Sequence, residues 1–221
     1  KVNVVDNVAP EIACLADFNA YVQPTNGCKA DSTMTIQMLK DAYVKANATS
    51  ATEISTATNE NKIPYAYTKD GDGNVDKVYD ECGTELSFFV GLTAEEEKSS
   101  VDVNVSLDDD DTYVYWTMKD ASGNASRCST LVSPKDSTKP EIAESLDVLK
   151  LDGVDADNKC QGVSDLSYSA ISNMLNISDC SKTEISYVIV HEDGTKTTAK
   201  KVEEDAFYKF KETLNDGDVI E

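Results

Sequence analysis

The sequence is poor in histidine, with His191 as the single one, and none of its cysteines forms a CxxC pair. The ligand spacing of a zinc site is therefore absent. A Ser-His-Asp or Cys-His catalytic site would need His191, which stands beside the turn Glu192-Asp193-Gly194 and is more simply an exposed residue at the end of a strand. No phosphate-binding loop or dinucleotide fingerprint occurs either. Paired carboxylates, as in glycoside hydrolysis, stay open among the 41 acidic residues, but nothing singles out a pair, so we expect no enzyme.

Positive charge is also scarce. The chain has 20 basic against 41 acidic residues and a formal net charge of −21. Binding to nucleic acid or to an anionic membrane surface needs a basic patch, so this composition argues against both kinds of partner. No run approaches 18 consecutive apolar residues, which argues against a direct membrane span by a helix. No signal peptide is recognisable, so secretion has to be judged from other features.

Six cysteines are present, an even number. Because zinc spacing is absent, a disulfide framework is the better interpretation, and it implies an oxidising compartment. Four Asn-x-Ser/Thr sequons favour the same location, outside the cell. Their acceptor residues are Asn47, Asn104, Asn124 and Asn176. We therefore expect an extracellular protein of the cell surface, with glycosylation at these four residues as an open alternative.

Local patterns are mostly typical of strands. Residues 112–118 read Thr-Tyr-Val-Tyr-Trp-Thr-Met, and alternation places Val114, Trp116 and Met118 on one inward face. Further strands are predicted over 85–90, 101–107 and 184–190. Turn formers separate the arms of two hairpins, 65–69 with 75–79 and 185–190 with 196–202. An insertion at about 38–62 is expected to hold one short helix, so the predicted class is all-β.

An internal repeat divides the chain. The segment Asp6-Asn-Val-Ala-Pro10-Glu-Ile-Ala recurs as Asp136-Ser-Thr-Lys-Pro140-Glu-Ile-Ala. Three more matches follow in the same order: Gly27-Cys28 with Lys159-Cys160, Asp80-Glu-Cys82 with Asp179-Cys180, and Leu107-Asp-Asp-Asp-Asp111 with Leu214-Asn-Asp-Gly-Asp218. We infer a last strand of a preceding module over 1–5, a complete module over 6–135 and a second module over 136–221. The second module then lacks its final strands within this chain, which leaves strand exchange between subunits or, more simply, a longer native chain.

The first module contains, in this order, the motifs Ala9-Pro-Glu-Ile-Ala-Cys14, Gly27-Cys28, Asp80-Glu-Cys82-Gly83 and Asp120-Ala-Ser-Gly-Asn124-Ala-Ser-Arg-Cys128. This order resembles the hyalin-repeat (HYR) family of immunoglobulin-like domains. The resemblance implies tandem immunoglobulin-like β-sandwiches with the disulfides Cys14–Cys128, Cys28–Cys82 and Cys160–Cys180. It also implies a place among surface adhesins and matrix proteins, in which such modules act as spacers or adhesive units.

The acidic loops raise the question of calcium. The segment Asp70-Gly-Asp72-Gly-Asn74-Val-Asp76 places oxygen ligands at every second position, and Glu81 is the twelfth residue counted from Asp70. A hairpin turn explains the same residues, because Asp-Gly and Gly-Asn are turn formers. Calcium at Asp70, Asp72, Asn74, Asp76 and Glu81 is therefore one of two alternatives. Calcium or plain solvated surface is also open for the acidic run 108–111 and for the linker acids Asp6, Glu11, Asp120 and Asp136.

These features predict an extracellular structural or adhesive repeat protein, part of a cell-surface adhesin, filament or coat. The expected partners are neighbouring copies or modules of the same protein, and cell-surface glycans or proteins; calcium is the one cofactor considered. The alternative is a carbohydrate-binding or ancillary module of a secreted enzyme, which would need exposed aromatic residues on one face. Its candidates are Tyr65, Tyr67, Tyr113 and Tyr115, whereas Trp116 is expected in the core.

Overall fold

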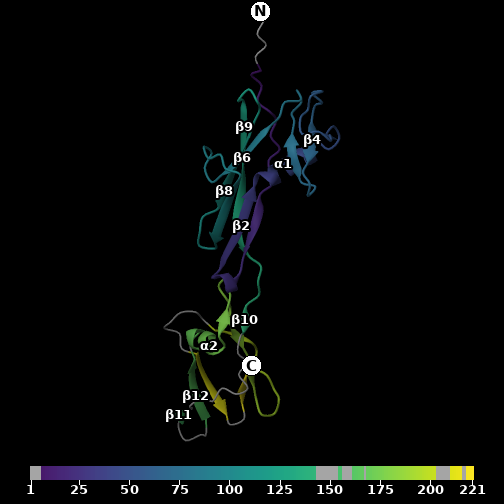
Figure 1. The fold of residues 1–221 in the computed structure, drawn as a ribbon. Coiled ribbons are helices and arrows are strands. Elements are labelled where there is room, and N and C mark those ends of the chain that lie inside the picture. Colours follow the sequence, from purple (N-terminus) through teal and green to yellow (C-terminus); the bar gives the residue numbers. More distant parts are fainter. Residues whose placement is uncertain (1–5, 143–153, 156–160, 167, 203–209, 216–217) are drawn as a thin grey trace, which may run out of the picture. The chain divides into compact units, whose positions relative to one another are not determined.

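The computed structural model describes residues 6–142, 154–155, 161–166, 168–202, 210–215 and 218–221, with the backbone alone for 154–155, 161–166, 170, 174 and 210–215. The chain forms two compact units, Lys1–Ser137 and Thr138–Glu221, called unit 1 and unit 2 below (Figure 1). Strands dominate, and two α-helices occur among the described residues, so the expected all-β class is confirmed. The strand predicted over 1–5 lies outside the described residues.

Unit 1 contains a four-stranded sheet in which the strand order is β1-β9-β8-β6. Its strands are β1 (Phe18–Val22), β6 (Ser87–Gly91), β8 (Thr112–Lys119) and β9 (Ala125–Asp136). β8 lies antiparallel between β6 and β9, whereas β1 runs parallel to the end of β9. The predicted strand over 112–118 is therefore central in the sheet, and its inward residues Val114, Trp116 and Met118 are fully buried, as expected.

A two-stranded antiparallel ribbon packs against this sheet. It consists of β2 (Lys29–Thr35) and β7 (Ser100–Ser106), joined to β1 through a short 3₁₀ turn, η1 (Pro24–Asn26). β2 contacts β1, and β7 contacts β6 and β9. Along β7 the residues alternate, so that Val101, Val103 and Val105 are buried and Asp102 and Asn104 are exposed. The core of unit 1 lies between the ribbon and the sheet.

The connection from β2 to β6 is a folded insertion. It contains α1 (Ile36–Ala46), β3 (Thr52–Glu53), β4 (Ala66–Lys69) and β5 (Val75–Val78). Leu39 and Tyr43 lie one helical turn apart on α1 and are both buried, and the Tyr43 ring packs edge-on against Phe88 of β6 at 6.3 Å between centroids. The expected helix is present, but it begins before residue 38. The insertion also continues past 62, because the predicted hairpin at 65–79 forms β4 and β5 within it.

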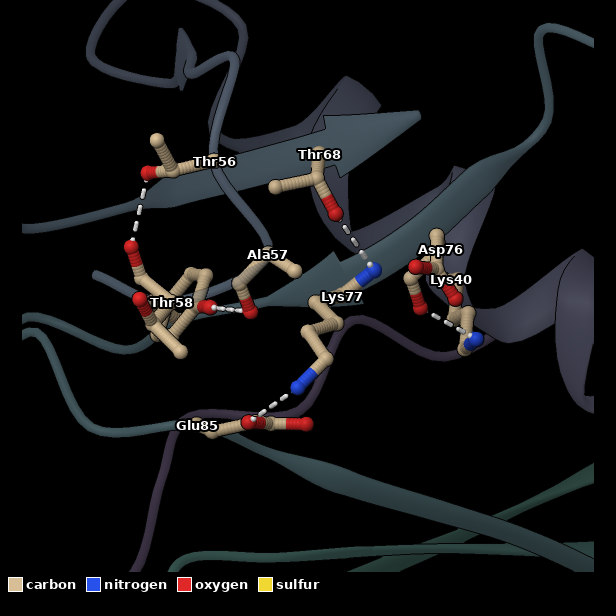
Figure 2. A network of polar contacts seen from close by, with 9 residues as sticks. Lys40, Thr56, Ala57, Thr58, Thr68, Asp76, Lys77 and Glu85 are labelled. Carbon is tan, nitrogen blue, oxygen red and sulfur yellow. Dashed lines mark hydrogen bonds and ion pairs between the residues drawn. The ribbon is translucent and has the colours of Figure 1, made fainter. Parts of the chain in front are cut away.

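Polar contacts tie the elements of the insertion together (Figure 2). The Lys40 ammonium of α1 donates to the carbonyl of Asp76 in β5 at 2.5 Å. The backbone N–H of Lys77 donates to Thr68 Oγ1 of β4 at 3.1 Å, and its ammonium pairs with Glu85 at 3.0 Å. Helix, hairpin and the segment entering β6 are therefore connected to one another, which makes the insertion an ordered part of unit 1.

Unit 2 has shorter strands. They are β10 (Glu141–Ile142) with β13 (Ile177–Ser178), β11 (Val154–Asp155) with β12 (Gln161–Leu166) and β17 (Phe210–Asn215), β14 (Ser186–Tyr187) with β16 (Lys200–Lys201), and β15 (Ile189–Val190) with β18 (Val219–Ile220). One helix, α2 (Tyr168–Met174), follows β12. Tyr187, Ile189 and Val202 form a buried cluster. In the described part of the chain, neither helix is long and apolar enough to cross a membrane.

Unit 2 repeats three features of unit 1. β12 starts directly after Cys160 and pairs antiparallel with β17, as β2 starts directly after Cys28 and pairs with β7. Helix α2 follows β12, as α1 follows β2. β15 pairs with β18, as β6 pairs with β8. In each case one valine of the first strand, Val190 or Val90, also forms a bridge to the segment that follows that strand. The repeat seen in the sequence therefore corresponds to a repeat of strand pairing.

Candidate functional site

The beginning and the end of unit 1 are joined covalently. Cys14, in the segment before β1, forms a disulfide with Cys128 of β9, with 6.1 Å between the Cα atoms and a sequence separation of 114. The family resemblance implies this pair. Close to it, Thr130 Oγ1 donates to the carbonyl of Leu15 at 3.0 Å and accepts the indole N–H of Trp116 at 2.9 Å. The first segment of unit 1 is thus held on the last strand by a covalent bond and by a hydrogen bond that continues into the core.

The other cysteines depart from the implied pattern. Cys28 and Cys180 are both disulfide-bonded, whereas Cys82 is free and exposed. The expected disulfide Cys28–Cys82 is therefore wrong. The expected disulfide Cys160–Cys180 includes a residue outside the described ones.

The positions of the two cysteines explain the correction. The pKa of the Cys82 thiol is raised by desolvation and further by carboxylates that include Asp6. The carbonyl of Asp6 accepts a hydrogen bond at 3.3 Å from Asn124, the residue before β9 begins. Cys28 follows β1, whose last residue pairs with the last residue of β9. Because β9 has 12 residues and spans about 40 Å, the two cysteines cannot reach the Cα separation of under about 7 Å that a disulfide requires.

The acidic loop considered either as a calcium ligand set or as a hairpin turn forms the turn between β4 and β5. Asp70 Oδ1 accepts the backbone N–H groups of Asp72 and Asn74, each at 2.9 Å, and Asp70 Oδ2 accepts the Asn74 amide at 3.2 Å. Asp76 lies on β5 and Glu81 in the next turn, so the five expected ligands are distributed over two turns and a strand. Among the described residues no group of three or more His, Cys, Asp or Glu could hold a metal ion.

The same turn recurs at two more places. Asp80 Oδ1 accepts the N–H groups of Cys82 and Thr84, at 2.9 and 2.8 Å, and Asp120 Oδ1 accepts the N–H of Asn124 at 2.9 Å. In each of the three turns a glycine stands three residues after the aspartate with a positive φ, of 88°, 71° and 89° in chain order. Only glycine adopts this conformation without strain. The Asp-x-x-Gly pattern therefore uses its carboxylate to build the loop.

These carboxylates differ in their surroundings. Hydrogen bonds from the backbone and side chain of Asn74 lower the pKa of Asp70. Burial raises the pKa of Asp80. At Asp120, desolvation acts upwards, but hydrogen bonds from the side chain and backbone of Asn124 outweigh it and lower the pKa. Asp120 is therefore a stabilising anion, whereas Asp80 carries an unfavourable buried charge.

Three of the four sequon asparagines already use their amides within unit 1. The Asn47 amide donates to the carbonyl of Tyr43 at the end of α1, at 3.0 Å. The Asn124 amide donates to Asp120 Oδ2 at 2.7 Å. The Asn104 amide donates to Asp31 across the ribbon, and Asn176 is exposed in unit 2.

The four tyrosines expected to form a sugar-binding face do not lie together. Tyr65 and Tyr67 belong to the hairpin of the insertion and are half-buried, whereas Tyr113 and Tyr115 belong to β8. β4, which holds Tyr67, pairs with β3 and β5 and not with the four-stranded sheet. Tyr21 of β1, which was not among the expected tyrosines, shares a face with Tyr113 instead. The alternation within β1 was the signal that could have found it.

We name the solvent-facing side of the four-stranded sheet the outer sheet face. Alternation with the buried residues and the strand register assign to it Asn19, Tyr21, Ser87, Phe89, Gly91, Tyr113, Tyr115, Thr117, Lys119, Ala125, Arg127, Ser129, Leu131, Ser133 and Lys135. Gly91 and Thr117 of this set are nevertheless buried. None of these residues is acidic, but carboxylates border them: Asp17 Oδ1 accepts the N–H of Leu131 at 2.8 Å, and Asp111 directly precedes β8. Tyr21 and Tyr113 are 54% and 49% exposed. The outer sheet face therefore exposes two large rings beside acidic residues at its edges.

His191 takes part in a contact within unit 2. Its Nδ1 lies 3.1 Å from Oδ1 of Asp218, whose side chain is buried. The histidine itself is half-buried, and the contact connects the end of β15 to the residue before β18. The contact with Asp218 gives His191 a structural role within unit 2.

No protein-family model matches the chain, and no curated protein or solved structure does either. The features that remain for an inference of function are the repeated units, the covalent tie within unit 1 and the outer sheet face.

Proposed function

We propose that the chain is a non-enzymatic, extracellular structural protein in which immunoglobulin-like modules follow one another in series. The strand pairing of unit 1 supports the immunoglobulin-like part of this proposal. Its antiparallel strands β6, β8 and β9 correspond in chain order and pairing to strands C, F and G of such a sandwich, and β2 and β7 correspond to B and E. The insertion then lies between B and C, where a loop can grow without disturbing the sheets.

The recurrence of strand pairing in unit 2 is the observation that carries the proposal. Ribbon, following helix and the β15–β18 pair recur in the order of unit 1, after a second Pro-Glu-Ile segment. A chain built from repeats of one unit in series is typical of spacers and fibres. It fits neighbouring modules or further copies of this chain as partners.

Disulfide bonding supports a location outside the cell. Disulfides persist in oxidising compartments and are rare in the cytosol. Three aspartates, Asp70, Asp80 and Asp120, use their carboxylates to build turns, and the proposal does not depend on a metal ion. The resemblance to hyalin repeats, with the bond between Cys14 and Cys128, is consistent with a surface adhesin, filament or coat.

The proposal is tested in the cells that produce the protein. Antibodies against the chain should label intact cells, and external protease should remove the label. Labelling that appears only after permeabilisation would contradict the extracellular location. A purified preparation that turns over a substrate, with loss of turnover on changing a single carboxylate, would contradict the non-enzymatic part.

A further inference from the structure

The four Asn-x-Ser/Thr sequons raise one question, namely which asparagine the folded protein leaves free to hold a glycan. A glycan is bulky and stays in water, so it is compatible with the fold only where the asparagine amide faces solvent and is not needed by the structure. The amide has two N–H groups, and attachment of a sugar replaces one of them. The contacts of the four asparagines therefore distinguish the sequons from one another.

Asn124 is engaged by its own turn. Its amide donates to Asp120 Oδ2 at 2.7 Å and to the carbonyl of Asp6 at 3.3 Å, so two acceptors occupy its two N–H groups. The last residue of this sequon is engaged as well, because the Ser126 hydroxyl donates to the carbonyl of Pro10. A glycan on Asn124 would replace a hydrogen bond that holds the turn and the first segment of unit 1 together.

Asn104 is engaged on the ribbon. Its amide donates to Asp31, the residue directly opposite, and the Ser106 hydroxyl of the same sequon donates to Asp109 Oδ2 at 2.8 Å. Hydrogen bonds from Asn26 and Asn104 lower the pKa of Asp31, so the Asn104 amide stabilises a carboxylate. A glycan on Asn104 would disturb a contact between the two strands of the ribbon.

Asn47 is engaged at the end of α1. Its amide and its backbone N–H both donate to the carbonyl of Tyr43, at 3.0 and 3.1 Å. Asn47 is half-buried, and the helix that it ends holds Leu39 and Tyr43 in the core. A glycan on Asn47 would therefore act on the end of a packed helix.

Asn176 has none of these ties. It follows α2, and its backbone N–H donates to the carbonyl of Asn173 at 3.3 Å. Its φ of 45° is left-handed, a conformation that asparagine tolerates better than most residues. The Asn176 side chain is exposed, and within the part of the chain that the structure describes it has no hydrogen-bond partner. Asn173 and Ser178 on either side are exposed too, so a bulky group at Asn176 has room in solvent.

The surroundings of Asn176 favour a hydrophilic group. The next residue, Ile177, pairs across β13 and β10 with Ile142, which is 60% exposed. No third strand joins this pair among the described residues, so both of its edges are open to pairing with another chain. A glycan beside the pair would hinder such pairing and would cover an exposed apolar residue.

We propose that Asn176 is the N-glycosylation site of this chain, and that the other three sequons stay unmodified. The co-reactant is an oligosaccharide on a polyprenyl diphosphate. The amide nitrogen of Asn176 forms a bond to the anomeric carbon of the first sugar, and the bond from that carbon to the diphosphate oxygen breaks. The diphosphate leaves with the electron pair, and the nitrogen loses one proton to solvent. This inference rests on the extracellular location proposed above.

The test uses the full chain with its disulfides intact, isolated from the cells that produce it. Its proteolytic peptides are analysed by mass spectrometry with electron-transfer fragmentation, which keeps the sugar on its residue. We expect a glycan mass on Asn176 and unmodified asparagine at the other three sequons.

Variants sharpen the assignment. Asn176→Gln and Ser178→Ala should each lower the mass of the intact protein by that of the glycan, whereas Ser178→Thr, which keeps the sequon, should retain it. Asn104→Gln changes the other exposed sequon asparagine and is the matched control; it should leave the glycan in place.

Unmodified Asn176 would overturn the proposal, as would a glycan on any of the other three asparagines. A glycan that persists in the Asn176→Gln variant would belong to another residue and would overturn it too. Antibody labelling of intact cells separates this proposal from the one on which it rests. Unmodified Asn176 in protein that is labelled from outside overturns the modification site alone, whereas absence of the label contradicts the location itself.

Discussion

Pulling unit 1 along its chain tests how the disulfide Cys14–Cys128 divides the load. Force that enters at the first residues reaches Cys14 before β1, crosses to Cys128 and leaves along β9 towards unit 2. The residues between the two cysteines are then outside the load path. If the modules form a row, this bond would keep the sheet, the ribbon and the insertion folded under tension.

The expected length follows from the sequence separation of 114. At about 3.5 Å per extended residue, the closed loop withholds about 400 Å of chain, while the segments of unit 1 outside it give at most roughly 80 Å. A single-molecule experiment would hold the chain at its amino terminus and at Lys139, which is exposed. The variant Cys28→Ser removes the other bonded cysteine of unit 1, so that the Cys14–Cys128 bond alone accounts for the difference.

Without reductant we expect no step near 400 Å at any force below bond rupture. With reductant a step of about 400 Å should appear. Reduction should also lower the free energy of unfolding by about 5 kcal/mol, the value for closing a loop of this length. A full-length step in the non-reduced protein would refute the load path.

Three further changes probe unit 1. Asp120→Asn replaces the acceptor of the Asn124 amide by a second donor, and we expect the free energy of unfolding to fall by about 1–3 kcal/mol at pH 7 in urea titrations. Because the folded pKa of Asp120 is lowered from 3.8, its contribution is present above that value and is lost as the pH falls through the folded pKa, so the variant should show a flatter loss of stability in acid. Thr130→Val leaves the Trp116 indole N–H without its partner in the core. As a single substitution it should lower the free energy of unfolding by about 1–3 kcal/mol. Alkylation of the folded, non-reduced chain followed by peptide mapping should modify Cys82, as a free exposed thiol.

Asp80 provides a matched control for the change at Asp120. Asp80→Asn keeps an Oδ1 that can accept both backbone N–H groups and removes a buried charge, so it should leave stability at pH 7 unchanged or raise it. Equal losses for this variant and for Asp120→Asn would contradict the distinction drawn between the two turns. Protection of Cys82 from alkylation until reductant is added would show that it is bonded, in conflict with the structure.

Much of the β structure could be predicted from local pattern. Strand β8 has the period of two that buries Val114, Trp116 and Met118, and Asp-x-x-Gly marks the turns because glycine alone accepts their positive φ. The hairpin of the insertion was predicted within a residue or two for the same reason. The helix was placed late, because the segment before it has a strand-like start and the boundary depends on where β2 stops pairing with β7.

Pairings between distant segments could not be derived in this way. Nothing local distinguishes Cys82 from Cys128 as a partner, since their positions depend on which end of β9 each segment reaches. The calcium alternative stayed open because a row of carboxylates looks the same in a metal loop and in a turn. The structure adds that Asp70 accepts hydrogen bonds from the backbone of its own loop.

The sequence by itself determined the elements that depend on neighbours in the chain: the strands, their inward faces, the turns and the repeat. Tertiary structure decided what depends on register. It placed Tyr21 of β1 on the same face as Tyr113 of β8 and separated Tyr67 from both. A period of two fixes which side of its own strand a residue occupies, but only pairing between strands fixes which residues from distant segments share a surface.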